Sequence, residues 1–168
     1  MTETFARNAP ASTTIGIIEA IAITRQPMAL MEPLEEVAVS LEAGLEHDIR
    51  GRKSRRKVSI LFSQDWRDAC RETGAPLDWL ARRANLLVSG LRSPAEHGGT
   101  YIIGDGEDQG EGVILRVEME TDPCEVMDAA RPGLRQAMTA DWRGGVCCTV
   151  LKAGIIRTGD RVGYTGPC

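Results

Sequence analysis

The sequence predicts a mostly β protein with a few helices, in the α+β class, built as an antiparallel barrel or sandwich. Two observations lead to this fold class: short segments with strand-like patterns recur along the chain, and helical patterns are few and short. The chain has 168 residues, a length that suits one domain around one hydrophobic core.

Three segments alternate apolar with smaller or polar residues, as strands with one buried face do. They are EVAVSLEAGL (36–45), KVSILF (57–62) and VILRVEME (113–120). Two further segments, 14–23 and 145–156, are almost continuously apolar and rich in β-branched residues. This composition is typical of strands that are covered on both faces.

Helices are expected at 63–72, 76–84 and 132–145. Ser63 is a candidate N-cap for the first, and Pro76 suits the opening turn of the second. In the third, an apolar stripe precedes Gly144, which would end the helix. The stripe consists of Leu134, Ala137, Met138 and Trp142. It predicts a core-facing helix; docking of a partner protein on the stripe is the alternative.

The charge and cysteine content narrow the class of protein. A net charge of −4 argues against a nucleic-acid-binding protein, because such proteins neutralise phosphates with a basic surface. The chain has neither a membrane-length apolar run nor a signal-peptide core, so we expect a cytoplasmic protein without membrane contact. Five irregularly spaced cysteines indicate reduced thiols. Residues 1–13 and 164–168 are expected to be tails flanking one domain, 14–163.

Several candidate sites can be set aside. The glycine-rich segment 104–112 lacks the Lys-Ser/Thr of a phosphate loop and is interpreted as a hairpin turn. Cys147 and Cys148 are neighbours in a predicted strand, so their side chains should point to opposite faces and cannot grip one metal. His47 and His97 stand alone. A structural zinc site and a histidine general base are therefore not expected.

The run RGRKSRRK (50–57) has two interpretations. Charge runs are usually solvated loops. The functional alternative is an anion clamp, since arginine presents a forked set of donors that matches phosphate or carboxylate. Arg50 is the first basic residue of this run.

The segment ETDPCEVMD (120–128) places a thiol at a predicted helix start. Asp122 would be the N-cap, Pro123 the first helical residue and Glu125 part of a capping box. Cys124 would then lie in the first turn, where the helix dipole favours a thiolate. The flanking acids oppose that effect, so a nearby arginine would be needed for strong activation. A small buried apolar residue is the other interpretation of Cys124.

An ordered set of segments resembles the MOSC domain, the family named after the C-terminal part of molybdenum cofactor sulfurases, and most of all its small stand-alone bacterial members. These segments are VSLEAGLEHD, RANLLVSGL, DPCEVMD, PGLRQAM and WRGGVCCTVLKAGIIRTGDRV. The resemblance covers 14–163 and implies an antiparallel MOSC-type β-barrel with a few helices.

The resemblance also implies roles for particular residues. Cys124 corresponds to the family's cysteine that carries sulfur as a persulfide or ligates molybdenum. Arg83 and Asn85, in an Arg-x-Asn-Leu stretch, are implied contacts to the pterin or phosphate of a molybdopterin-type cofactor, together with Arg50 and Asp48. His47 stands where the family's Gly-Leu-x-Gly-Asp pattern has its second glycine, which puts the turn before Asp48 in question.

The functions that follow are sulfur carriage or molybdenum cofactor binding. The alternatives are a molybdenum-dependent reductase of N-hydroxylated compounds, a non-catalytic anion-binding barrel, or an adaptor. The chain has no room for a pyridoxal phosphate domain, so a sulfur donor such as a cysteine desulfurase would be a separate partner. A reductase would need a redox partner, because the sequence contains no flavin, haem or iron-sulfur motif.

Overall fold

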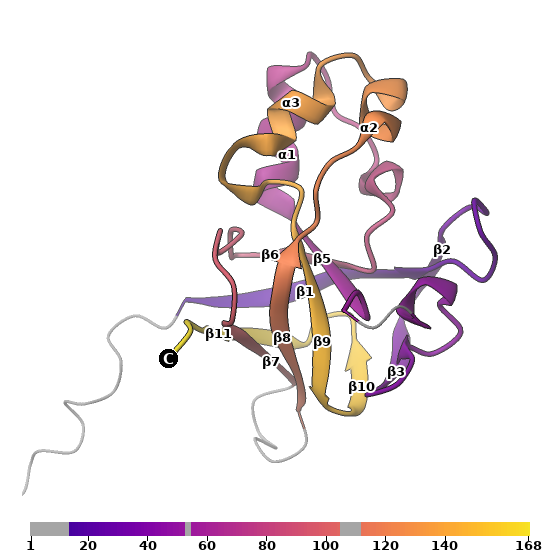
Figure 1. Cartoon of the computed structure of the whole chain (residues 1–168), viewed down its shortest axis with the longest axis vertical. Helices are drawn as coiled ribbons and strands as arrows, with labels where there is room; N and C mark the ends of the chain where they lie inside the picture. The colour runs from indigo at the N-terminus through magenta and orange to yellow at the C-terminus, as the bar shows by residue number, and fades with distance from the viewer. Residues whose placement is uncertain (1–13, 53–54, 105–111) are drawn as a thin grey trace, which may run out of the picture.

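Seven strands of the chain close into a β-barrel (Figure 1). The computed structural model describes residues 14–52, 55–104 and 112–168. Around the barrel the order is β11-β7-β8-β9-β5-β6-β1, and β1 pairs back onto β11. The barrel strands are β1 (Ile15–Ile23), β5 (Val58–Phe62), β6 (Leu86–Ser89), β7 (Thr100–Gly104), β8 (Val113–Glu120), β9 (Val146–Lys152) and β11 (Arg161–Thr165).

The barrel is mixed, so the predicted fold class is confirmed and the description of the barrel as antiparallel needs one correction. β5 and β6 run parallel, with Ile60 opposite Leu86, whereas the other neighbours around the barrel are antiparallel. The reason is the connection: a parallel pair needs a crossover, and here the crossover contains α1 (Ser63–Glu72).

Most predicted strands lie where the alternation placed them, but the segment 145–156 forms two strands. β9 ends at Lys152, and β10 (Gly154–Arg157) leaves the barrel to pair with β3 (Glu36–Ser40). β3 also pairs with β4 (Gly44–Leu45), while β2 (Glu32–Leu34) extends the large sheet beyond β1.

The apolar strand 14–23 is covered on both faces only in its second half. Ile15 and Ile17 are exposed, at 47% and 39%, whereas Ile21, Ala22 and Ile23 are buried. The second half of the strand pairs with β2 as well as β6, and the first half pairs with β11. Continuous hydrophobicity therefore overstated the burial of this strand.

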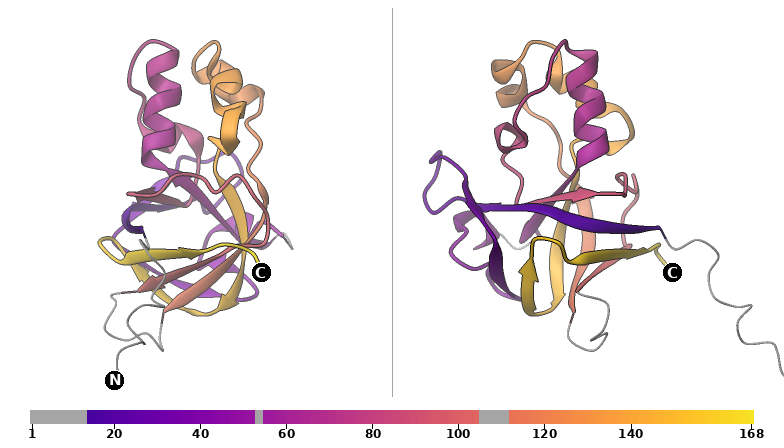
Figure 2. Two further views of the ribbon diagram at one scale, coloured as in Figure 1. Left: turned by 90° about the vertical axis from the view of Figure 1, so that its left-hand side faces the viewer. Right: turned by 180° about the vertical axis from the view of Figure 1, so that it is seen from behind.

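The three α-helices stand together at one end of the barrel (Figures 1 and 2). They are α1, α2 (Glu125–Ala130) and α3 (Leu134–Thr139), and we call this group the helical cap. The helix predicted at 63–72 is confirmed as α1, whereas the helices predicted at 76–84 and 132–145 are longer than the observed ones. Residues 76–84 contain only a 3₁₀ turn, Trp79–Arg82, and 140–142 form another after α3. At α1 the N-cap position is Phe62, which makes no side-chain cap, so the prediction of Ser63 as N-cap is wrong.

Two hydrophobic clusters hold the molecule together. One fills the barrel interior, and the other lies between the helical cap and the outward-facing side chains of β5 and β6, including Leu61 and Leu87. Leu134 and Met138 of α3 are fully buried in the second cluster. The prediction that this stripe faces the core is therefore confirmed. Burial of side chains of this size contributes about 1.5–3 kcal/mol each to stability.

The glycine-rich segment connects two paired strands. β7 and β8 are antiparallel, with Ile103 opposite Val113, as expected for strands joined by a hairpin. The turn predicted for 104–112 itself lies largely outside the described residues, which resume at Gly112. The predicted N-terminal tail, 1–13, also lies outside them, and β11 continues through Thr165.

Candidate functional site: an arginine pocket between barrel and cap

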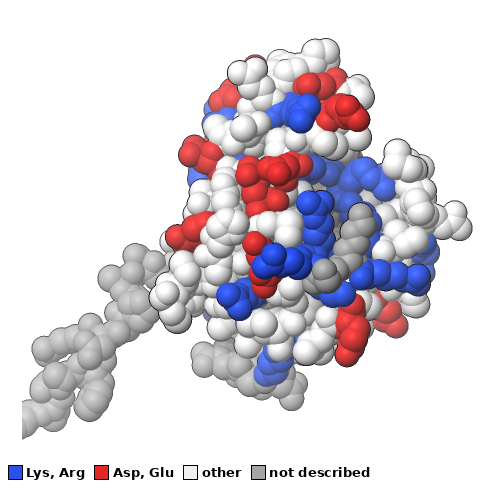
Figure 3. Space-filling model, viewed as in Figure 1, with Lys and Arg blue, Asp and Glu red and all other residues white. Residues whose placement is uncertain are grey.

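A pocket of about 130 Å³ opens where the barrel meets the helical cap. Four arginines line it, Arg50, Arg56, Arg82 and Arg83, together with Cys147. We call this the arginine pocket. Figure 3 shows basic side chains gathered in one area of the surface, next to a group of acidic side chains. Because like charges are brought together at one cavity, the pocket is suited to an anion.

Arg82 and Arg83 come from a single 3₁₀ turn. Asp78 caps this turn, its Oδ1 accepting a hydrogen bond from the Leu80 amide at 2.9 Å, and Arg83 ends it in a left-handed conformation with φ of 64°. Both side chains line the pocket. Arg83, which was predicted to contact a cofactor, therefore lies at the site. Its neighbour Arg82 was not predicted to lie there.

Arg82 is the most deeply buried arginine of the pocket, with 8% exposure. Its Nη2 donates to the carbonyl oxygens of Thr121 at 2.8 Å and Gly144 at 3.1 Å. Burial lowers the pKa of this guanidinium, while nearby Cys124 and Cys147 act in the opposite direction. These carbonyl contacts hold the charge in place without neutralising it. Only the double arginine in ARRAN could have drawn attention to this residue.

Arg50 enters the pocket from the 3₁₀ turn Ile49–Arg52. Its Nε is buried without a hydrogen-bond partner and lies 4.0 Å from Asp48 Oδ1. Burial lowers the pKa of Arg50, and Asp48 opposes that shift. Asp48 Oδ2 is likewise buried without a hydrogen-bond partner, so this ion pair is held without a direct hydrogen bond at either atom. Two residues of the run 50–57, Arg50 and Arg56, therefore line the pocket, which is the placement that the anion-clamp interpretation requires.

Asp48 plays a structural part beneath Arg50. Its side chain is fully buried, and Oδ1 accepts a hydrogen bond from the Thr24 amide at 2.9 Å. The preceding residue, His47, has φ of 67°, a conformation that glycine adopts without strain. The turn questioned at His47 therefore forms. Asp48 does not line the pocket, so its predicted contact with a cofactor would act through Arg50.

Asn85 lines the pocket, but its side chain is engaged in joining strands. Oδ1 accepts hydrogen bonds from the amide and the hydroxyl of Ser59 at 3.0 and 3.2 Å. Nδ2 donates to the carbonyl oxygen of Ala22 at 3.1 Å. The side chain is buried and bridges β5 and β1 from the start of β6. Both polar atoms of the Asn85 side chain are therefore already hydrogen-bonded within the wall of the pocket.

Cys124 is an exposed free thiol, so the interpretation as a buried apolar residue is wrong. It occupies the N-cap position of α2 in an extended conformation, with φ of −121°. The predicted capping box does not form, because α2 begins at Glu125 and no side chain caps it. Cys124 lies close enough to Arg82 to influence its charge equilibrium. Arg82, which comes from a distant part of the chain, is thus an arginine near Cys124 that the local sequence does not contain.

Cys147 and Cys148 point to opposite sides of β9, as predicted. Cys148 belongs to the barrel core, where burial raises the pKa of its thiol well above the usual value. Cys147 faces the arginine pocket, and its Sγ lies 3.2 Å from Thr121 Oγ1. The alternation rule found the two faces but could not show that one of them borders a charged cavity.

Two acids, Glu120 and Asp122, precede Cys124 in the chain. Burial and a hydrogen bond with Asp122 raise the pKa of Glu120, while Arg82 opposes the shift. Among the described residues, no group of three or more His, Cys, Asp or Glu side chains is arranged to hold a metal by itself. A metal at this site would therefore need ligands from a cofactor.

The fold and site define a class of protein: a small β-barrel with a helical cap and a basic, thiol-containing pocket between them. A model of the MOSC domain matches residues 47–163, well over half of the 168 residues. The chain therefore belongs to the MOSC domain family.

Solved structures show the same fold. The YUAD protein from Bacillus subtilis superposes with a TM-score of 0.71 at 20% identity, covering 89% of this chain and 95% of that chain. YiiM from Geobacillus stearothermophilus gives 0.68 at 18% identity, covering 90% and 75%. YiiM from Escherichia coli gives 0.62 at 17%, covering 90% and 71%. No curated protein matches the sequence.

Within the part of the chain that the structure describes, every helix is too short or too polar to cross a bilayer.

Proposed function

We propose that the protein binds a molybdenum cofactor of the molybdopterin type, with Cys124 as the thiol that ligates the metal. The observation that carries this proposal is the gathering of four arginines at one pocket. Asp48 is the carboxylate paired with Arg50, at 4.0 Å, and Arg50 Nε makes no hydrogen bond, so the positive charge of the pocket favours an anionic ligand.

The residues present suit such a group. The arginines would hold its phosphate, and Cys124 would supply a soft sulfur ligand, which molybdenum accepts. When bound, a molybdenum dithiolene centre supplies two-electron oxygen-atom chemistry. The chain itself contributes charge neutralisation through Arg50, Arg82 and Arg83, and access through the exposed position of Cys124.

The test is the molybdenum content of protein that is expressed in the cytoplasm of a host that makes the cofactor and is then purified. We expect near-stoichiometric molybdenum in the wild type and a loss of about tenfold or more in Cys124→Ala, since removal of a ligand typically costs that much affinity. Cys168→Ala is the matched control, because Cys168 is also an exposed free thiol. Molybdenum that is absent from the wild type, or undiminished in Cys124→Ala, contradicts the proposal.

Sulfur carriage is the second candidate function, and the exposure of Cys124 favours it. A persulfide carrier must present its thiolate to a partner. The proposed partner is a sulfur donor such as a cysteine desulfurase, whereas the cofactor-binding function would instead require a redox partner for turnover. Incubation with a desulfurase and cysteine should add one sulfur atom to Cys124, as read by peptide mass spectrometry. Cys168 should remain unmodified.

A further inference from the structure

Cys147 is a second thiol at the arginine pocket, and the functions proposed above do not use it. It lies on β9, has 4% exposure, and its Sγ borders the cavity. Thr121 Oγ1 lies 3.2 Å from this sulfur and either atom can be the donor, so the hydroxyl can donate a hydrogen bond to a thiolate. Cys147 is therefore almost buried, and a small molecule would reach it from the arginine pocket.

Positive charges surround Cys147 at the pocket. Arg50 and Arg82 line the same cavity and both interact electrostatically with it, so an anionic reagent is attracted to the position of this thiol.

The other buried cysteines differ in their surroundings. Cys148 lies in the apolar barrel interior. Cys70 belongs to the cluster beneath the helical cap and borders a separate cavity with two arginines, Arg67 and Arg71, whereas four arginines line the cavity at Cys147.

The volume and charge of the pocket limit what can react there. A cavity of roughly 150 Å³ is enough for benzene, so the arginine pocket, at about 130 Å³, suits one small molecule. Four guanidinium groups select an anion, preferably a dianion with several oxygens that can accept their forked donors. A small dianion that also carries a transferable sulfur would place that sulfur beside Cys147.

We propose that Cys147 accepts sulfane sulfur from a small inorganic dianion with a transferable outer sulfur, namely thiosulfate, held by the pocket arginines. The Cys147 thiolate attacks the outer sulfur of thiosulfate and forms a new S–S bond. The original S–S bond breaks, and sulfite leaves with the bonding electron pair. The product is a Cys147 persulfide anion, and a nucleophile such as cyanide can remove its outer sulfur as thiocyanate, which regenerates the thiolate.

This inference deepens the sulfur-carriage function, on which it rests for its biological role, by naming the class of sulfur source. Thr121 contacts Cys147, and Cys124 is three residues further along the chain. Three residues span at most about 10 Å, so Cys124 lies within that distance of Thr121. The persulfide would thus form next to the exposed thiol. Since the pocket suits one small anion, inorganic phosphate should compete with thiosulfate.

The experiment measures thiocyanate formed from thiosulfate and cyanide by the purified full-length protein. We expect turnover by the wild type and a loss of about 100-fold or more in Cys147→Ser, as for removal of a nucleophile. Cys168→Ala is the control for general thiol chemistry and should keep full activity. Mass spectrometry after thiosulfate alone should place one extra sulfur on the peptide that contains Cys147. Absence of thiocyanate from the wild type, or full activity in Cys147→Ser, overturns the proposal.

A second measurement does not depend on the folding of Cys147→Ser. In the wild type, alkylation of Cys147 by iodoacetamide should slow about tenfold in saturating phosphate or thiosulfate, whereas alkylation of exposed Cys168 should not change. In Arg56→Gln the KM for thiosulfate should rise about tenfold with a smaller change in kcat, because a charge-assisted contact is lost. Unprotected Cys147 together with an unchanged KM would contradict the proposal.

The two proposals fail separately. Molybdenum that depends on Cys124, without any thiocyanate formation, overturns the Cys147 inference and leaves cofactor binding intact. Thiocyanate formation that depends on Cys147, in protein that never loads molybdenum, supports the inference and contradicts cofactor binding.

Discussion

At the scale of single residues, Gly145 follows Gly144 of the pocket wall and packs against the backbone of β5. It has φ of 95°, and an added Cβ would overlap the carbonyl oxygen of Ile60 on β5. Its own carbonyl oxygen accepts a hydrogen bond from the Thr121 amide at 2.9 Å. Gly145 therefore brings β8 and β9 together beside the carbonyl groups that hold Arg82.

Gly145→Ala should lower the free energy of unfolding by about 3 kcal/mol or more, because a left-handed alanine adds roughly 1–2 kcal/mol of strain and the overlap with backbone adds to it. Gly159→Ala is the matched control. Gly159 has φ of 92°, but an added Cβ meets nothing within 4 Å, so only the backbone strain should appear. Urea denaturation measures both; equal losses would show that the contact with Ile60 relaxes at no cost.

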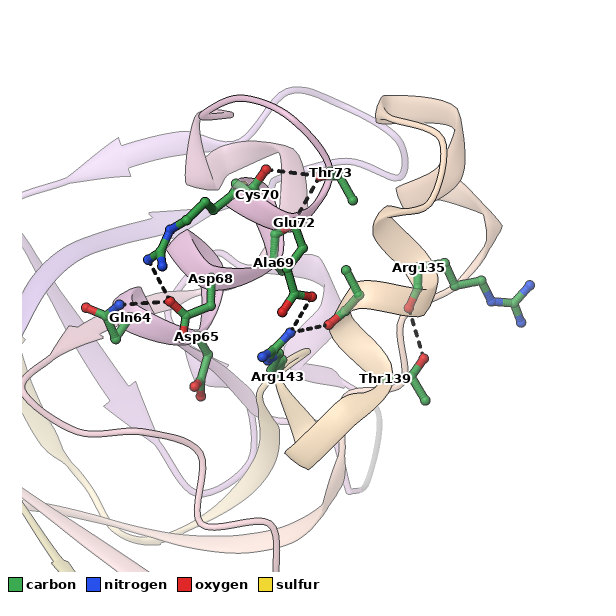
Figure 4. Close-up of polar contacts among 12 residues, drawn as sticks. Gln64, Asp65, Asp68, Ala69, Cys70, Glu72, Thr73, Arg135, Thr139 and Arg143 are labelled. Atoms are coloured by element: carbon green, nitrogen blue, oxygen red, sulfur yellow. Dashed lines mark hydrogen bonds and ion pairs between the residues drawn. The ribbon is translucent and has the colours of Figure 1, made fainter.

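At the scale of elements, α1 is tied to the rest of the chain by ion pairs. Figure 4 shows Asp68 of α1 with Gln64, and Glu72 with Arg143, which follows α3. Asp68 Oδ2 also accepts a hydrogen bond from Arg92 Nη1 at 2.8 Å, and the same nitrogen contacts Asp65. Arg92 follows β6, so these contacts join α1 to the chain segment after β6.

The Asp68 contacts predict a dependence of stability on pH. The hydrogen bond from Arg92 lowers the pKa of Asp68 in the folded state, so its stabilising contribution is present above the unfolded pKa of about 4 and is lost as the pH falls through the folded value. Asp68→Asn should flatten the decrease in stability between about pH 5 and pH 2.

Thermal unfolding over this pH range tests the prediction. Asp65 has the opposite sign, because burial raises its pKa, so it must be left unchanged in the comparison. Arg71 also pairs with Asp68 and is well exposed. Arg71→Gln, as a control, should alter the acid limb less than Asp68→Asn does. Parallel curves for the wild type and Asp68→Asn would show that the ion pairs are screened by solvent.

At the scale of the whole molecule, the parallel seam between β5 and β6 closes the barrel and positions the arginine pocket. Asn85 bridges this seam through its contacts with Ser59 and Ala22. The crossover between the two strands also carries the 3₁₀ turn that contains Arg82. Closure of the barrel and assembly of the site therefore depend on the same segment.

Asn85→Ala should lower the free energy of unfolding by about 2–3 kcal/mol, because three side-chain hydrogen bonds are lost and buried backbone groups lose their partners. Thr149→Ala, which removes one partly exposed hydrogen bond to Glu118, should cost about 1 kcal/mol or less. Chemical denaturation measures both. A small loss of stability for Asn85→Ala combined with weaker phosphate binding would instead support the direct contact to a cofactor that the sequence suggested.

Much of the fold could be predicted because it depends on local periodicity. The alternation in 57–62 and 113–120 placed β5 and β8, and the apolar stripe of α3 correctly indicated its buried face. The division of 145–156 into β9 and β10 could not be predicted, because both strands are apolar and the change of sheet at Ala153 leaves no local signal. The parallel seam was missed for a related reason, since strand direction depends on how a crossover packs.

The sequence by itself determined the fold class, the family and the exceptional position of Cys124 in its Asp-Pro-Cys context. Tertiary structure decided which groups surround that thiol. Arg82 comes from a turn before β6, Arg50 from a turn after β4, and Cys147 from β9. Charge and shape at a pocket depend on distances between segments that are remote along the chain, and local patterns carry no information about those distances. The physical setting of both thiols is therefore a property of the closed barrel.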